Sequence, residues 1–164
     1  MFKLIRNMGS PTRWDITAYM DWLKANPGAL STDLMDAVSE DRYSLDGDRS
    51  LWHAELRQMA WGRRGGRIQF RSDSGTHFSE FVYTGVRKVH VEGRRFRAAP
   101  SLVTHEVLPF RNGYIRHAMS FLGGDFLVIY ANHVAFNDVH DEACRRSWQG
   151  ETFIDPLEAN EWIA

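Results

Sequence analysis

The stretch LVTHEVLPFRNGYIRHAMSFLGGDFLVIYANHVAFN, residues 102–137, decides the fold of this chain. Three apolar runs within it are separated by Asn112-Gly113 and by Gly123-Gly124. Such dipeptides favour hairpin turns, because asparagine and glycine tolerate the positive φ angles that tight turns between antiparallel strands require. The stretch therefore predicts three neighbouring strands joined by two hairpins, which is an antiparallel β-meander.

Loop length decides which residues of the meander share a face, because successive side chains of a strand point to opposite sides. An even-length loop at each turn places Met119 opposite Val128 and Phe121 opposite Phe126. It also gives one side that is largely apolar, formed by Leu108, Phe110, Ile115, Met119 and Phe121. This apolar side supports the even parity, and we expect it to face the interior.

Polar residues interrupt the apolar side. The same parity brings Glu106, His117 and Tyr130 onto it, together with Thr104 and Asn132. A polar group buried without a partner costs on the order of 1–3 kcal/mol, so these side chains either bond to one another or line a cavity. In the first alternative they form a bonded core network in which nothing reacts.

In the second alternative, His117, Tyr130 and Glu106 form a catalytic acid–base cluster. The carboxylate orients and charges the imidazole, and Tyr130 or Asn132 donates a hydrogen bond to a developing oxyanion. Histidine is the natural proton carrier here, because its unperturbed pKa lies nearest neutrality. The binding residues expected around this cluster are Asn132, Thr104, Phe110, Met119, Phe121 and Val128.

The rest of the chain predicts a single α+β domain in three parts. Residues 1–61 are expected to be mainly helical, residues 62–137 to form a curved antiparallel sheet, and residues 138–164 to form a tail. The first helix starts at Asp15 and ends before Asn26, and the second starts at Ser31 or Thr32. The third expected helix carries Leu51, Trp52, Leu56 and Met59.

Further strands are expected before the meander, at residues 67–71, 78–92 and 94–96. Gly85 predicts a bend within the long second one, because glycine inside a strand pattern often marks a bulge. In the tail, Asp155-Pro156 has the form of a helix start. We expect a short terminal helix there that docks on the body of the domain.

Composition favours a globular domain in the cytoplasm. The 164 residues are 43% hydrophobic and 25% charged, and no apolar run approaches the roughly 20 residues that span a membrane. The N-terminal residues do not resemble a signal peptide, and Cys144 is the single cysteine. These features predict a reducing compartment without disulfides and no membrane association. With the proton-transfer chemistry considered above, no organic cofactor is expected.

Arginines gather in residues 62–97, where they alternate with aromatic residues in segments 61–67 and 94–97. Arginine and aromatic side chains are what single-stranded nucleic acid needs for phosphate contacts and base stacking. The whole chain is slightly acidic, however, with a net charge of −1. Nucleic-acid binding is therefore the less favoured interpretation of this segment, and a solvated surface is the favoured one.

A metal site is also weighed at the end of the meander. His133 and His140, with a nearby carboxylate, supply the ligand types of zinc or iron, but no recognised metal-binding spacing is present. Residues 138–142 are instead interpreted as a solvated acidic loop. We expect no metal site.

The chain resembles the nuclear-transport-factor-like or SnoaL-like superfamily in its order of elements, which is a few helices followed by a curved antiparallel sheet. It also resembles that superfamily in the segment between two late strands, Val107-Leu-Pro-Phe-Arg-Asn-Gly-Tyr-Ile-Arg116. The resemblance covers roughly residues 14–122. It implies helices packed on the concave face of a cone-like sheet that leaves a pocket. Some members are isomerases, dehydratases, cyclases or epoxide hydrolases that use a pocket histidine or carboxylate, whereas others only bind small molecules or proteins.

Two features depart from that family. The strand over residues 126–136 and the tail extend past the usual end of the fold, and the family has no invariant catalytic signature to transfer. The function expected from the sequence is binding of a small, partly apolar molecule, with or without proton-transfer chemistry of the isomerase, dehydratase or cyclase kind. The alternative is a non-catalytic interaction module, such as a subunit, an inhibitor or an immunity-type protein. A homodimer is expected to form through the outer face of the sheet.

Overall fold

The computed structural model describes residues 1–139 except 11, 46, 76 and 94–99. The protein is an α+β domain with few helices and two antiparallel sheets, one of six strands and one of two. In chain order the elements are β1 (Arg6–Ser10), β2 (Arg13–Asp15), α1 (Thr17–Ala25), α2 (Thr32–Ala37), η1 (Glu40–Arg42), β3 (Glu55–Gly62), β4 (Gly65–Arg71), β5 (Phe78–Glu92), β6 (Leu102–Pro109), η2 (Arg111–Gly113), β7 (Ile115–Phe121) and β8 (Phe126–Val139).

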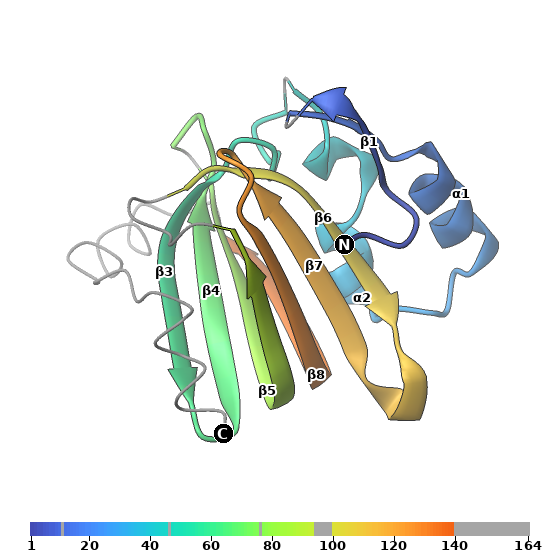
Figure 1. Cartoon of the computed structure of the whole chain (residues 1–164), viewed down its shortest axis with the longest axis vertical. Coiled ribbons are helices and arrows are strands. Elements are labelled where there is room, and N and C mark those ends of the chain that lie inside the picture. The colour runs from blue at the N-terminus through green and yellow to red at the C-terminus, as the bar shows by residue number, and fades with distance from the viewer. Residues whose placement is uncertain (11, 46, 76, 94–99, 140–164) are drawn as a thin grey trace.

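The large sheet has the strand order β3-β4-β5-β8-β7-β6 (Figure 1). The expected meander is confirmed, because β6, β7 and β8 are antiparallel neighbours. The sheet also curls until its two edge strands meet. Glu55 at the start of β3 forms a bridge with Ser101, and the Leu102 amide donates to the Ala54 carbonyl at 2.8 Å. The sheet is therefore closed into a ring at this end.

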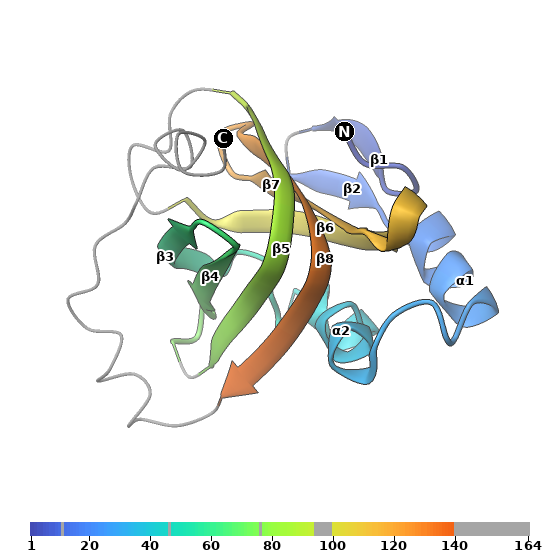
Figure 2. The same cartoon turned by 90° about the horizontal axis from the view of Figure 1, so that it is seen from below.

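Both long strands of the sheet, β5 and β8, are strongly curved (Figure 2). Gly85 has φ +63°, and a Cβ atom at this position would lie 2.6 Å from Nδ2 of Asn132 on β8. The pairing register then shifts between Val86 and Lys88. The bend expected at Gly85 is confirmed, and it depends on the absence of a side chain there.

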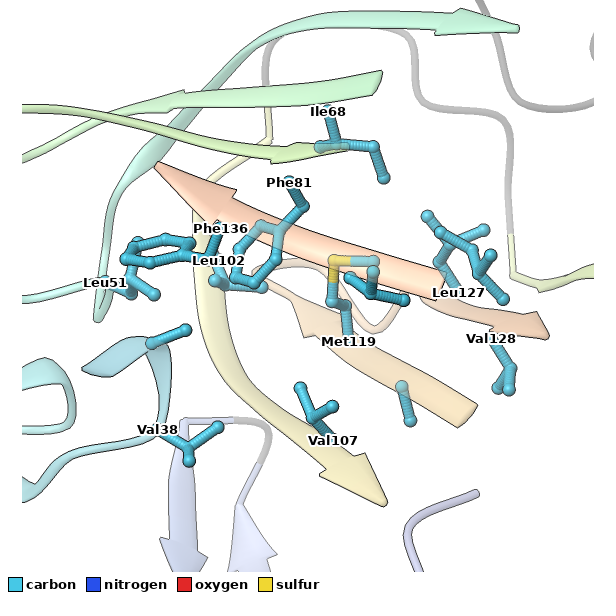
Figure 3. Close-up of a cluster of buried hydrophobic side chains, with 14 of the residues drawn as sticks. Val38, Leu51, Ile68, Phe81, Leu102, Val107, Met119, Leu127, Val128 and Phe136 are labelled. Carbon is cyan, nitrogen blue, oxygen red and sulfur yellow. The ribbon is translucent and has the colours of Figure 1, made fainter. Parts of the chain in front are cut away.

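The side chains inside the curled sheet form the core (Figure 3). The Phe81 ring lies between Phe70 and Phe136, with centroid separations of 6.3 Å and 4.9 Å. Met119 and Phe121 from β7 are also completely buried. Because each such side chain stabilises the fold by roughly 1.5–3 kcal/mol on burial, this interior is the main source of stability.

Two of the three expected helices are confirmed as α1 and α2, whereas the third is wrong. Leu56 and Met59 lie instead in β3, where they pair with Phe70 and Ile68 of β4. A register shift between Leu56 and Gln58 puts residues three apart on one face. A bulged strand thus imitates the spacing of a helix.

Two tyrosines attach the helical region to the free edge of the large sheet. The Tyr19 hydroxyl, on α1, donates to the Val107 carbonyl at 2.7 Å and accepts from the Val107 amide at 2.9 Å. The Tyr43 hydroxyl donates to the His105 carbonyl at 2.8 Å. These bonds satisfy backbone groups of β6 that the sheet leaves unpaired.

A buried charge network attaches the segment after α2 to the end of β8. Arg42 is fully buried and forms ion pairs with Asp36 at 2.6 Å and with Asp138 at 2.9 Å. Arg49 joins the same two carboxylates from the exposed side. The interpretation of Asp138 as the start of a solvated loop is therefore wrong, because it belongs to β8 and pairs with a buried arginine.

Several predictions fall outside the described residues. They are the strand at 94–96, the terminal helix after Asp155 and the docking of the tail. Cys144 and His140 lie outside them as well.

Candidate functional site

The register of the meander separates the residues that were expected to form an acid–base cluster. His117 is paired with Val107 and with Ile129, whereas Glu106 is paired with Ala118 and Tyr130 with Arg116. An odd number of residues lies between the last paired positions at each hairpin, so the even parity is wrong. A slip of one residue moves every side chain to the other face. His117 consequently faces the interior, and Glu106 and Tyr130 face the outer side of the sheet.

In the interior, His117 belongs to a chain of buried hydrogen bonds. Its Nδ1 atom lies 2.8 Å from the hydroxyl of Tyr83, and its Nε2 atom lies 3.1 Å from Nδ1 of His105. All three side chains are at most 1% exposed. His105 in turn stacks on Tyr43 at 5.2 Å. Tyr83 and His105 are thus the partners of His117, and sequence reasoning found neither of them.

His105 and His117, the two histidines of this hydrogen-bonded cluster, are neutral at pH 7. Burial lowers the pKa of His105 to about 3, and burial together with the nearby His105 lowers the pKa of His117 well below its usual value. Burial also raises the pKa of Tyr83, which keeps its proton. Its hydroxyl can donate to Nδ1 of His117, which then donates from Nε2 to Nδ1 of His105. The cluster is therefore a buried chain of hydrogen bonds packed among aromatic rings.

On the outer side, the Glu106 carboxylate holds the N-terminal segment against the sheet. Its oxygens accept hydrogen bonds from the backbone amides of residues 3, 4 and 5, at 2.7–3.2 Å. Arg116, on the neighbouring strand, forms an ion pair with Glu106 at 3.0 Å and also donates to the Met1 carbonyl. Glu106 is completely buried and Arg116 is 3% exposed. Glu106 is therefore an anchor for the N-terminal segment.

The anchored segment forms one wall of an open cleft of about 900 Å³. Its apolar lining includes Phe2, whose ring packs edge-on against Trp14 at 5.1 Å and against Phe126 at 4.9 Å. Lys3 and Arg6 supply positive charge at its rim. The opposite wall belongs to the ends of β5, β7 and β8, through residues that include Glu92, Ser120 and Phe126.

The other expected binding residues are dispersed. Met119 and Phe121 lie in the filled interior, and Val128 is buried on the outer face. Asn132 is exposed and packs on Gly85. Thr104 is buried, with no hydrogen-bond partner for its hydroxyl among the described residues. Phe110 and Tyr130 do come together, with ring centroids 5.0 Å apart, in a second and smaller pocket.

The N-terminal hairpin of β1 and β2, which carries much of the cleft lining, was not expected from the sequence. Its strands are short, and their residues are mostly exposed. The signal that was present is Asn7, whose side chain accepts from the Gly9 amide at 2.7 Å and donates to the Ser10 carbonyl at 3.0 Å. Gly9 has φ +83°, which is typical of a turn residue.

Within the described ranges, no group of three or more histidine, cysteine, aspartate or glutamate side chains is arranged to hold a metal ion. His133 is exposed and is paired with Thr84. Among the same residues, no helix has the length and apolar character needed to cross a membrane.

No protein-family model, no curated protein and no solved structure matches the chain.

Proposed function

We propose that the protein binds a small, partly apolar molecule that carries a negative charge, in the cleft beneath the N-terminal segment. The observation that carries this proposal is the lining of the cleft, where Phe2, Trp14 and Phe126 form an aromatic wall beside the cations Lys3 and Arg6. Small-molecule sites are typically concave and mainly apolar, with a few polar groups that orient the ligand. The cleft volume of about 900 Å³ lies in the usual range for such sites.

Proton-transfer chemistry is not part of this proposal. The histidine that was expected to supply it lies in the core, and neither His105 nor His117 is among the residues that line the cleft. Lys3 and Arg6 outnumber Glu92, the one acidic residue among the described residues that line the cleft, so the charge there favours an anionic ligand.

We also propose that the protein belongs to the SnoaL-like superfamily and that its helices enclose a cone-like sheet. The order of helices and curved antiparallel sheet supports them. The site proposed here differs from that family in its place, because it lies on the outer face of the sheet. We propose further that the protein is cytoplasmic and forms a homodimer, and sedimentation at several protein concentrations tests the dimer.

The test of ligand binding uses 8-anilino-1-naphthalenesulfonate, a fluorescent anion with an apolar ring system, and dodecanoate as its competitor. We expect saturable binding of one dye per chain, displacement by dodecanoate, and at least fivefold weaker binding in Trp14→Ala. Trp52→Ala is the matched control, because Trp52 packs on His53 outside this cleft. Absence of saturable binding, or equal losses in the two variants, would contradict the proposal. Urea unfolding of each variant establishes that the dye reports on folded protein.

A further inference from the structure

A second pocket, on the same outer face of the sheet as the cleft, is lined by aromatic rings and cations and plays no part in the proposed function. It has a volume of about 310 Å³ and lies where β5 and β8 meet the connection between β6 and β7. Its rings are those of Phe110, Tyr114 and Tyr130. Its charged side chains are those of Arg87, Lys88 and Arg111.

The bulge in β5 explains why two cations line one pocket. Lys88 is paired with Tyr130, and the register shift between Val86 and Lys88 leaves Arg87 as an extra residue in the ladder. A bulge re-aims the side chains around it, whereas a regular strand would send neighbouring residues to opposite faces. Both Arg87 and Lys88 line the pocket as a result.

The opposite wall is held by the turn between β6 and β7. The Phe110 amide donates to the Tyr114 carbonyl at 2.7 Å, and Asn112 adopts φ +61°. The ring of Phe110 packs edge-on against Tyr130, and the guanidinium of Arg111 lies 5.4 Å from the Phe110 centroid. The rings are therefore fixed relative to one another, with a cation beside them.

The charge of this pocket is uncompensated within the described part of the chain. None of its lining residues is acidic, and none of the ion pairs between described residues involves Arg87, Lys88 or Arg111. Other arginines of the sheet do have such partners, for example Arg71 with Glu55. Three cations around aromatic rings are complementary to a ligand with a planar ring and a doubly charged group.

We propose that this aromatic–cationic pocket binds a nucleoside monophosphate or a similar small aryl phosphate, with the ring against Tyr130 or Tyr114 and the phosphate between Arg87, Lys88 and Arg111. Arginine binds phosphate oxygens in pairs, and base-on-aromatic stacking tolerates different bases. The volume admits one such unit, because it lies at the lower limit of ordinary ligand pockets.

The pocket is separate from the cleft beneath the N-terminal segment. Tyr130 lines the pocket and Phe126 lines the cleft, and these two residues lie on the same face of β8 about 13 Å apart along the strand. The two sites share no lining residue. Failure of one proposal therefore leaves the other standing.

The test is isothermal titration of the full chain with AMP at low salt, with adenosine and ribose 5-phosphate as the two half-ligands. We expect AMP to bind at least tenfold more tightly than either half-ligand, and more weakly as salt is added. The double variant Arg87→Ala/Arg111→Ala should weaken AMP binding by tenfold or more, because hydrogen bonds to charged groups are lost. Tyr130→Leu should weaken it about fivefold to tenfold, whereas Tyr130→Phe keeps the ring and should retain binding.

The matched control is Arg63→Ala/Arg64→Ala, which removes the same charge from two exposed arginines in the turn between β3 and β4. Equal losses in the two double variants would overturn the proposal, since they would indicate a general charge effect. AMP binding no tighter than that of adenosine would overturn it as well. A single-stranded oligonucleotide that bound far more tightly than AMP and depended on Arg63 and Arg64 would replace it with a nucleic-acid surface.

Discussion

Replacing Glu106 by glutamine should be among the most damaging single changes outside the interior core. The carboxylate neutralises Arg116, which is 3% exposed, and it accepts three backbone amides of the N-terminal segment. Glutamine keeps one acceptor but leaves the guanidinium buried without a counter-charge. Breaking a buried ion pair by removing one partner costs roughly 3–5 kcal/mol. We therefore expect Glu106→Gln to lower the free energy of unfolding by about that amount in urea titrations followed by circular dichroism.

A double-variant cycle separates the ion pair from simple loss of packing. Glu106→Gln/Arg116→Met removes both charges, so its loss should be smaller than the sum of the two single losses by about 1 kcal/mol or more. Faster hydrogen exchange of the amides of residues 3–5 should accompany each variant that lacks the carboxylate. The control is Glu92→Gln, because Glu92 is exposed and its one ion pair among the described residues is with His90. A loss below about 1 kcal/mol for Glu106→Gln, or additive losses in the cycle, would refute the anchoring role.

Three further predictions concern the body of the domain. Gly85→Ala should destabilise the protein by about 1–3 kcal/mol in urea, because φ is +63° and the added methyl group meets a side chain of β8, whereas Gly28→Ala has open space and should change little. Acidification from pH 7 to pH 5 should remove about 2 kcal/mol of stability through His105. The pKa of His105 is about 3 in the folded state and 6.5 in the unfolded chain, so only the unfolded chain binds a proton over this range. Stability therefore decreases as the pH is lowered from 6.5 towards 3. An unchanged urea midpoint between pH 7 and pH 5 would contradict the neutral, buried histidines. Arg42→Met should cost roughly 3 kcal/mol, because Asp36 on α2 and Asp138 on β8 lose their buried partner and keep only the half-exposed Arg49 as an ion-pair partner among the described residues. Lys24→Met, at an exposed ion pair, should cost less than about 1 kcal/mol. Similar losses in these two variants would show that burial of the pair does not matter.

The strands of the meander could be predicted from sequence, whereas their register could not. Asn112-Gly113 and Gly123-Gly124 mark where the chain turns, and both turns are present. The number of residues that each loop consumes depends on its conformation, such as the short 3₁₀ turn η2 before β7. A loop that is longer or shorter by one residue moves every side chain of the next strand to the opposite face of the sheet. For this reason the strands are predicted correctly, whereas the prediction that His117, Glu106 and Tyr130 share one face is wrong.

Long-range partners account for the remaining differences. The carboxylate of Glu106 binds the N-terminal segment, and the buried Arg42 binds Asp138 at the far end of the sheet. No local pattern indicates either contact, because each joins residues far apart in the sequence. The spacing of Leu56 and Met59 wrongly predicted a helix for a local reason, because the bulge in β3 puts these two residues on one face of a strand. By contrast, Gly85 indicated the bend in β5 correctly, because a glycine within a strand usually marks a bulge or a close approach of another part of the chain.

Closure of the sheet has a consequence for the time course of folding. Strands β3, β4 and β5 pair with their neighbours in sequence, and so do β6, β7 and β8, so each half can assemble through short loops. The halves are joined by the β5–β8 ladder and by the bridge between Glu55 and Ser101, which connect distant parts of the chain. Because distant contacts bear the largest loop-closure entropy, docking of the two halves should limit the refolding rate. At high protein concentration, two molecules can form the same β5–β8 ladder by domain swapping, in which β5 of one molecule pairs with β8 of the other.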